Sequence, residues 1–219
     1  MSIPTISFVL PCYGRPERTR RMLECIGSQS ISNWEGFIYG DYCHDFTLLL
    51  ESDWYQSWVK DQTEKGNIIY TGNMPENGGG HGYAIINNAI QAATGSYFLF
   101  LSNDDTISPN HFEHYLTGIR ELDRVHEIEY DFVFFNTAVP ANNGTRISNL
   151  TYGGCGHAEL IIRTEFLKRV QPHGSEYGHD WHLIQNMLNM PLCRFRKALS
   201  QDCTYHIHSI PGKTIDTIN

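Results

Sequence analysis

The sequence has few long apolar runs and few basic residues, and both shortages exclude classes of protein. No stretch approaches the ~20 apolar residues of a membrane-spanning helix, and the first residues lack a signal-peptide pattern. There are 16 lysines and arginines against 24 aspartates and glutamates. The resulting net charge of −8 argues against a nucleic-acid partner or an anionic membrane surface, because phosphate binding needs clustered basic side chains.

Paired cysteines are also missing, since the six cysteines are scattered without a C-x-x-C motif. In a chain of 219 residues this pattern favours reduced thiols over a disulfide framework or a zinc site. We therefore expect a cytoplasmic protein, in which the glycosylation triplets at Asn143 and Asn149 arise by chance. No activating partner for Cys155 is evident, which argues against a cysteine nucleophile.

The chain is otherwise that of an ordinary globular protein, with 41% apolar and 18% charged residues. Apolar runs of strand length alternate with segments of helical spacing, and no repeat or linker demands a domain boundary. The expected strands are 6–10, 37–39, 67–70, 97–101 and 132–135, and the expected helices are 16–29, 54–65, 83–93, 111–122, 164–170 and 180–188. This alternation predicts an α/β fold with a mostly parallel central sheet flanked by helices, in one Rossmann-like domain over residues 1–219.

Two adjacent carboxylates follow the most apolar of these runs, in the motif Asn103-Asp104-Asp105. Like charges this close repel one another unless a cation relieves them, and hard oxygen ligands suit Mg²⁺ or Mn²⁺ together with a diphosphate. The alternative is a plain turn, because asparagine and aspartate favour turns and Pro109 follows shortly. The motif on its own does not decide between a metal site and a turn.

Ligands of open α/β sheets bind outside the carboxyl ends of the strands. Three expected strands end in polar residues there, at 11–15, at Gly40-Asp41 and at 103–105. Arginines 15, 18, 20 and 21 cluster at one helix start, which favours an anionic ligand nearby. The glycines at 78–80 form neither a Walker loop nor a G-x-G-x-x-G motif, since no Lys-Ser/Thr follows.

At this point the sequence resembles glycosyltransferase family 2 over about half its length, residues 5–115. The matching motifs, in order, are Phe8 to Pro16, Asn33-Trp34-Glu35 before a strand and Asp41, Asn77-Gly78-Gly79, Asn87 to Ile90, Ala93 to Tyr97, and Asp104-Asp105. The resemblance implies a GT-A fold, a nucleotide-diphosphate sugar donor and inversion at the anomeric carbon. The short chain also resembles compact glycosyltransferase domains of large algal viruses, for which the compartment is the host cytoplasm.

The resemblance assigns the nucleobase pocket to the ends of the first two strands. Pro11 and Tyr13 would frame the pocket, with Tyr13 against the base and Arg15 near the base or diphosphate. Asp41 would accept a hydrogen bond from the uracil N3–H. Gly40 departs from the family, which has a first acid at this position. The alternative for Asp41 is a turn carboxylate that caps backbone N–H groups.

The metal and diphosphate would be held by the motif after the fourth strand. Asp105 would be the direct metal ligand, while Asp104 and Asn103 would reach the ribose or a metal-bound water. The glycine loop, with Gly79, would lie over the sugar nucleotide, or it is a plain flexible loop. Ile86 stands where an arginine is common in the family.

The late part of the chain would supply a base and acceptor contacts. Asp180 fits the carboxylate that deprotonates the acceptor hydroxyl, with Glu176 as the nearest substitute. The alternative for Asp180 is a helix N-cap, because an apolar helical run follows. Gly154, His157 and Trp181 are expected on the acceptor side.

Two late histidines, His206 and His208, alternate on an extended segment, so their imidazoles are expected to share one face. Several GT-A enzymes supply a late histidine to the metal, and one of these two would fill that role. The alternative is a pair of surface histidines. A three-ligand zinc site is disfavoured by the acids upstream.

These motifs together imply a metal-dependent inverting glycosyltransferase with Mn²⁺ or Mg²⁺ as cofactor. It would move a glucose- or rhamnose-like hexose from a UDP-sugar to a saccharide or another hydroxyl acceptor. Residues 1–110 would bind the nucleotide sugar and residues 111–219 the acceptor. A nucleotidyltransferase, a non-catalytic nucleotide-sugar binding module and a metal hydrolase built on the late histidines remain as alternatives, and oligomeric state is open.

Overall fold

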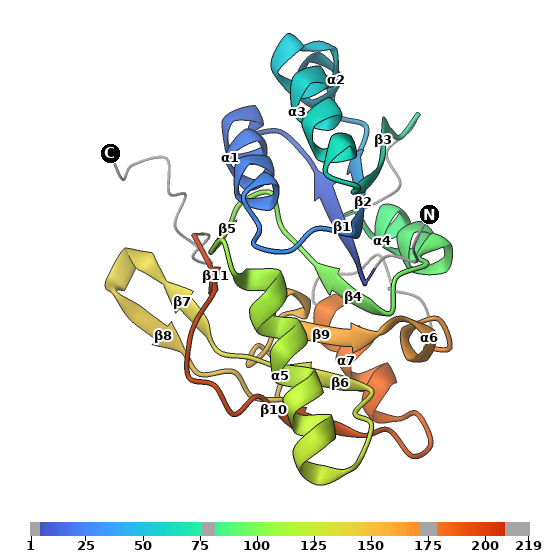
Figure 1. Ribbon diagram of the computed structural model, residues 1–219, viewed down its shortest axis with the longest axis vertical. Coiled ribbons are helices and arrows are strands. Elements are labelled where there is room, and N and C mark those ends of the chain that lie inside the picture. The colour runs from blue at the N-terminus through green and yellow to red at the C-terminus, as the bar shows by residue number, and fades with distance from the viewer. Residues whose placement is uncertain (1–4, 76–81, 171–178, 209–219) are drawn as a thin grey trace.

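A computed structural model describes residues 5–75, 82–170 and 179–208 of the chain, shown in Figure 1. Its central sheet has the strand order β10-β6-β9-β4-β1-β2-β3. The strands are β1 Ile6–Cys12, β2 Trp34–Gly40, β3 Ile68–Asn73, β4 Tyr97–Phe100, β6 Phe132–Phe134, β9 Leu160–Arg163 and β10 Phe195–Lys197. The expected α/β architecture with a mostly parallel sheet is confirmed.

One strand of this sheet runs against the others. β9 lies antiparallel between β4 and β6, whereas β1 pairs in parallel with β2 and β4, β2 with β3, and β6 with β10. The strand at residues 160–163 was not predicted from the sequence. The run has only four residues and is flanked by irregular segments, so periodicity does not distinguish it from part of a helix.

Helices cover both faces of the central sheet. They are α1 Pro16–Gly27, α2 His44–Glu51, α3 Asp53–Glu64, α4 Tyr83–Ala92, α5 His111–His126, α6 Thr164–Leu167 and α7 His179–Leu188. Alternate side chains of β1 point to opposite faces of the sheet. Phe8 and Leu10 pack in one core with α1, α2, α3 and α5. Val9 packs in the other core with α4, α6 and α7. In Figure 1, α1 and α5 lie in front of the sheet.

The helix α2 was not expected, because its charged and threonine-containing start resembles a loop.

No helix in the described ranges is both long enough and apolar enough to cross a bilayer. All six cysteines carry free thiols.

A second, smaller sheet has the strand order β5-β11-β7-β8 and lies at the left of Figure 1. Its strands are β5 Thr106–Ile107, β11 Tyr205–His206, β7 Thr137–Val139 and β8 Gly144–Arg146, and short 3-10 turns, η1 Pro140–Asn142 and η2 His157–Glu159, lie nearby in the chain. The sequence did not predict this sheet, since strands of two or three residues carry no periodicity. It brings residues 204–208 beside the segment that follows β4, where the Ser108 N–H donates to the Thr204 carbonyl (2.8 Å).

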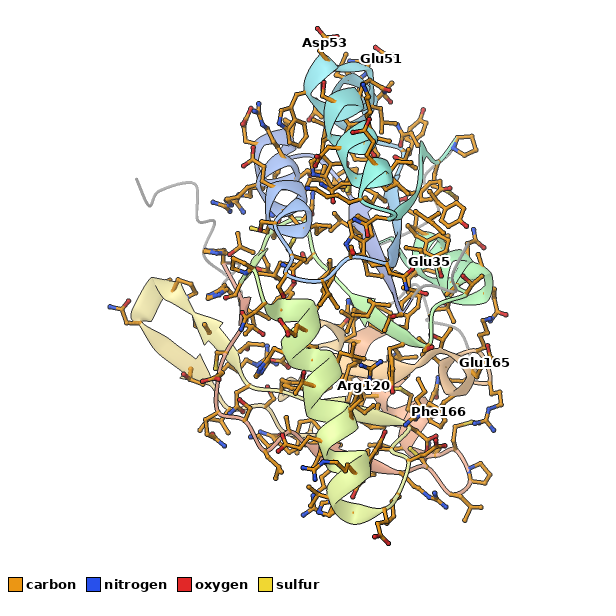
Figure 2. All side chains as sticks on the ribbon, in the orientation of Figure 1. Glu35, Glu51, Asp53, Arg120, Glu165 and Phe166 are labelled. Carbon is orange, nitrogen blue, oxygen red and sulfur yellow. The ribbon has the colours of Figure 1, made fainter. Side chains whose placement is uncertain are left out.

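A buried carboxylate joins β1, β2 and the turn before β4. Glu35, labelled in Figure 2, is fully buried on β2 and accepts hydrogen bonds from the Ser7 hydroxyl (2.6 Å) and the Gly95 N–H (3.0 Å). The Thr94 N–H and hydroxyl donate to the same carboxylate (2.5 and 3.0 Å). Because hydrogen bonds to a buried charge are strong, Glu35 fixes the α4–β4 turn and hence the entry of β4 into the sheet.

We predict that Glu35→Ala lowers the free energy of unfolding by about 3 kcal/mol, because buried donors of Ser7, Thr94 and Gly95 lose their acceptor. Urea unfolding followed by circular dichroism measures the loss. Glu51→Ala is the matched control, since Glu51 is exposed at the end of α2, far out in Figure 2, and should change stability by less than about 0.5 kcal/mol. Equal effects of the two substitutions would contradict the role given to Glu35.

Candidate active site

The carboxyl ends of β1, β2 and β4 lie at one edge of the central sheet. Cys12 pairs with Gly40 across β1 and β2, and the Asp41 N–H donates to the Cys12 carbonyl (2.9 Å). The Leu101 N–H donates to the Val9 carbonyl (2.9 Å) as β4 ends. The three polar strand ends that the sequence singled out therefore share one side of the molecule.

Asp41 is a buried carboxylate without a local partner. The residue is 7% exposed, and its carboxylate has no hydrogen bond or ion pair with any residue in the described ranges. The alternative, a turn carboxylate that caps backbone N–H groups, is not supported, because no backbone N–H of the described residues donates to the Asp41 carboxylate. The Asp41 oxygens are not fully enclosed, so solvent or a ligand donor reaches them.

The neighbours of Asp41 are aromatic or tightly packed. Tyr13 is 67% exposed, as expected for a ring available to stack on a ligand. Pro11 instead packs against the start of α4: a Cβ on Gly82, whose φ is +71°, would lie 2.5 Å from the Pro11 Cβ. Only glycine fits this approach of α4 to β1.

The absence of an acid at residue 40 has a steric cause. A Cβ on Gly40 would meet the Asn73 amide and lie 2.7 Å from Phe46 Cδ1. The Asn73 amide accepts from the Cys43 N–H (3.0 Å) and donates to the Cys43 carbonyl (2.8 Å) and the Thr47 hydroxyl (2.7 Å). Asn73 thus occupies the space beside Gly40 and holds the segment after Asp41.

Asp104 is neutralised by arginines rather than left to repel its neighbour. Its Oδ2 accepts a short hydrogen bond from Arg15, and Arg18 NH1 lies 3.9 Å from Oδ1. That Oδ1 atom is buried and has no hydrogen bond within the described part of the chain. The repulsion between Asp104 and Asp105 is therefore relieved in part by arginines and does not require a metal ion. The Oδ1 atom of Asp104 is the one oxygen of this carboxylate without a hydrogen-bond donor in the described residues.

Asn103 has a structural contact. Its buried amide donates to the Thr19 hydroxyl (3.0 Å) and lies 3.5 Å from the Tyr13 carbonyl. Asn103 therefore ties the segment after β4 to α1 and to the Tyr13 loop. This contact competes with the expected reach toward a ribose or a metal-bound water.

Asp105 is held by the small sheet. The residue is 5% exposed; its Oδ2 accepts from the Tyr205 hydroxyl (2.9 Å), and its Oδ1 accepts from the His208 backbone N–H (2.8 Å). Burial, and then the Asp105 charge, raises the pKa of Tyr205 well above its usual value, so the phenol stays protonated and donates. No sequence pattern points to Tyr205, because its partner lies 100 residues earlier in the chain.

His206 and His208 share a face, as their alternation predicted. The Nε2 atoms share hydrogen bonds with the hydroxyls of Ser108 and Thr106, respectively, each at 2.8 Å. Burial lowers the pKa of both imidazoles, and the nearby positive charge of Arg21 lowers the pKa of His208 further. Both rings are therefore neutral at pH 7, the form in which histidine binds metals.

The second group of candidate residues lies around the start of α7. Asp180 is the second residue of that helix, so it stands in the first turn and not at the N-cap. Its Oδ1 lies 3.0 Å from Nδ1 of His157, which precedes β9. The rings of Trp181 and Tyr152 meet edge to face, 6.4 Å apart.

The loop before His157 is shaped by a buried carboxylate that the sequence analysis missed. Glu159 is 1% exposed and accepts from the Gly156 N–H (2.6 Å) and the Thr137 hydroxyl (2.9 Å), with Arg146 Nε at 3.5 Å. A lone glutamate before a short apolar run has no sequence signature, since two of its partners, Thr137 and Arg146, come from other strands. The same loop packs Gly154 against Asn149, where a Cβ would clash.

Two expected site residues, Gly79 and the substitute base Glu176, lie outside the described residues. Cys155 is no nucleophile in this setting, because burial and the nearby Glu159 raise the pKa of its thiol and keep it protonated. Among the residues that the structure describes, no three His, Cys, Asp or Glu side chains are grouped as a metal site made by protein alone.

Several solved structures share this fold. S. aureus TarS (residues 1–349, in complex with UDP-GlcNAc) superposes with a TM-score of 0.70 at 18% identity, covering 98% of this chain and 61% of that one. The mannosyltransferase PcManGT from Pyrobaculum calidifontis, in complex with GDP-Man and Mn²⁺, gives a TM-score of 0.60 at 16% identity, covering 94% and 57%. At such identities the likeness establishes the GT-A fold.

Sequence relatives point the same way. An uncharacterized glycosyltransferase of Rickettsia typhi is 27% identical over 216 residues, 97% of this chain and 52% of the relative. The putative colanic acid biosynthesis glycosyl transferase WcaA of Escherichia coli is 26% identical over 136 residues, 62% of this chain and 43% of the relative. The chain thus spans about half the length of the relatives it matches.

The resemblance seen in the motifs is borne out by a family-wide comparison. The model of glycosyl transferase family 2 matches residues 7–156, which include β1, β2, β4 and the Asp104-Asp105 pair. Because this match covers more than half of the sequence, the chain belongs to glycosyltransferase family 2.

Proposed function

We propose that this chain is a metal-dependent inverting glycosyltransferase that moves a glucose- or rhamnose-like hexose from a UDP-sugar to a saccharide or another hydroxyl acceptor. The observation that carries the proposal is the end of β4. Phe100, its last residue, contacts the ring of His157 (centroids 4.7 Å apart), which in turn contacts Asp180. Asp104 and Asp105 stand four and five residues after Phe100 in the same chain segment, so the end of β4 lies between the acids of both candidate sites.

The donor nucleotide would lie across the ends of β1 and β2. Tyr13 offers an exposed ring for the base, and the unsatisfied carboxylate of Asp41 suits the N3–H of uracil. TarS, which shares the fold, has been solved with UDP and with UDP-GlcNAc, and this supports a UDP donor. Arg15 and Arg18 stand beside Asp104, where they are placed to meet a diphosphate.

The divalent ion would be Mn²⁺ or Mg²⁺, held by the acids after β4. The oxygens of Asp105 and the hydrogen-bond-free Oδ1 of Asp104 are hard donors that fit such an ion. One or two carboxylates suffice when substrate phosphates complete the coordination, so a protein-only cluster is not required. His206 or His208 would add a neutral nitrogen. When bound, the ion would offset charge that develops on the leaving UDP.

Asp180 would be the general base. It would accept the proton of the acceptor hydroxyl while that oxygen attacks the anomeric carbon from the face opposite UDP, and the bond between that carbon and UDP would break. Trp181, Gly154 and the loop before His157 would face the acceptor. Residues 1–110 would thus serve the donor and 111–219 the acceptor, with Tyr205 and His208 reaching back to Asp105.

The first test is a screen for UDP, GDP or dTDP release from the corresponding sugar nucleotides, with and without Mn²⁺. We expect UDP release from a UDP-hexose that depends on Mn²⁺, and a loss of about 100-fold or more in Asp180→Asn, because the amide does not accept the proton. Release of pyrophosphate would indicate a nucleotidyltransferase instead. Nucleotide binding without any turnover would indicate a binding module.

The metal assignment predicts two graded effects. Asp105→Ala should abolish Mn²⁺-dependent UDP binding, measured by isothermal titration calorimetry. Tyr205→Phe should weaken Mn²⁺ binding by about 10-fold, because the hydroxyl that orients Asp105 is lost while the ring still fills its place. Wild-type Mn²⁺ affinity in Asp105→Ala would contradict the assignment, and circular dichroism checks that both variants fold.

The base-pocket assignment predicts that Asp41→Ala weakens UDP binding by about 10-fold, since the uracil N3–H loses a charged acceptor. Asp45→Ala is the control, because Asp45 is exposed on α2 only four residues away. Titrations with UDP and GDP measure the two dissociation constants, and only the one for UDP should rise in Asp41→Ala. An equal loss for both nucleotides, or none for UDP, would be inconsistent with a uracil contact.

A further inference from the structure

His157 is clamped between the end of β4 and the start of α7. Its ring lies 4.7 Å from the Phe100 ring, at 41° between planes, and its Nδ1 lies 3.0 Å from Asp180 Oδ1. The His157 side chain is 15% exposed, whereas Asp180 is 38% exposed. The histidine is therefore the inner member of the pair and the aspartate the one nearer to solvent.

The backbone that carries His157 is also fixed. The preceding N–H, of Gly156, donates to the buried Glu159 carboxylate, and Glu159 N–H donates back to the Gly156 carbonyl (3.2 Å). Arg146 and the Thr137 hydroxyl hold the same carboxylate from the small sheet. Since its backbone is held and its ring packs on Phe100, His157 keeps Nδ1 close to Asp180.

We propose that His157 is a positioning residue that holds the Asp180 carboxylate in the orientation from which it accepts the acceptor proton. The inference rests on the proposed function. Nδ1 and Oδ1 lie at ion-pair distance without the alignment of a hydrogen bond; in the proposed role the His157 ring turns to donate its Nδ1–H to Asp180 Oδ1 and keeps that proton throughout, while the acceptor proton goes to Asp180. An exposed ion pair would constrain Asp180 weakly, but a half-buried ring packed on Phe100 loses little freedom when it forms the contact.

The second oxygen of Asp180 is placed by the same loop. A Cβ on Gly156 would lie 3.4 Å from Asp180 Oδ2, an ordinary contact distance, and Gly156 has the extended conformation (φ −98°, ψ 164°) that any residue adopts. Gly156→Ala therefore places a methyl group against that oxygen without backbone strain. The variant tests whether Asp180 accepts the acceptor proton on the side of its carboxylate that lies beside Gly156.

The experiment compares two nucleophiles in UDP release from UDP-glucose and UDP-GlcNAc with Mn²⁺, using whichever donor the wild type turns over faster. Water must lose a proton to a base as it attacks. Sodium azide carries its own charge, so it forms the carbon–nitrogen bond and displaces UDP without proton removal. Loss of Asp180 function should therefore slow the water reaction and spare the azide reaction, whereas a damaged donor site should slow both.

His157→Phe keeps an aromatic ring on Phe100 but removes the donor. It should lower kcat for the water reaction by roughly 10- to 100-fold, as expected when a catalytic group loses its alignment. The KM for the donor and the azide-dependent rate should stay within about threefold of wild type. His157→Asn, whose amide nitrogen takes the place of Nδ1, should recover most of the water rate. Gly156→Ala should slow the water reaction selectively.

The control is His182→Ala, which removes a histidine from the same helix without touching the pair and should leave both rates unchanged. A wild-type water rate in His157→Phe, with Asp180→Asn inactive, would overturn the positioning role alone. Equal losses with water and azide would mean that His157 is merely structural. If the wild type releases UDP from no donor, the proposed function fails instead.

Discussion

The hydrogen bonds that Asp105 accepts from Tyr205 and from the His208 N–H connect the two sheets of the molecule. Asp105 follows the central strand β4, and its partners belong to the C-terminal segment around β11. The same two segments are also joined by the β5–β11 ladder, by the Ser108 N–H that donates to the Thr204 carbonyl, and by the hydrogen bonds of His206 and His208 with the hydroxyls of Ser108 and Thr106. The candidate metal ligand is thus also a structural link, and substitutions there affect both properties.

Three of the four candidate acids have a partner within the described residues. Asp104 meets Arg15 and Arg18, Asp105 meets a protonated phenol and a backbone N–H, and Asp180 meets His157. Asp41 differs, because no described residue donates to its carboxylate. Asp41 is therefore the candidate acid at which a ligand donor would meet no competing donor from the described residues.

The sequence predicted what depends on periodicity and on strand ends. Alternating apolar runs located β1, β2, β4 and β6, whose first three members are parallel and end at one edge of the sheet. The roles given to Tyr13, Asp41 and Asp105 at that edge stay predictions. The sequence did not predict β9, the small sheet, or the partners Tyr205 and Glu159. These features depend on contacts between residues far apart in the chain, and their elements are too short to carry a pattern of their own.

A crystal structure of the chain with UDP and Mn²⁺ would test the central claim most directly. The account predicts an anomalous manganese signal bonded to a carboxylate oxygen of Asp105 and to the diphosphate, with the Tyr205 contact retained and the uracil against Asp41. Manganese and nucleotide bound elsewhere, or an Asp105 that keeps only its protein partners while UDP is bound, would contradict it.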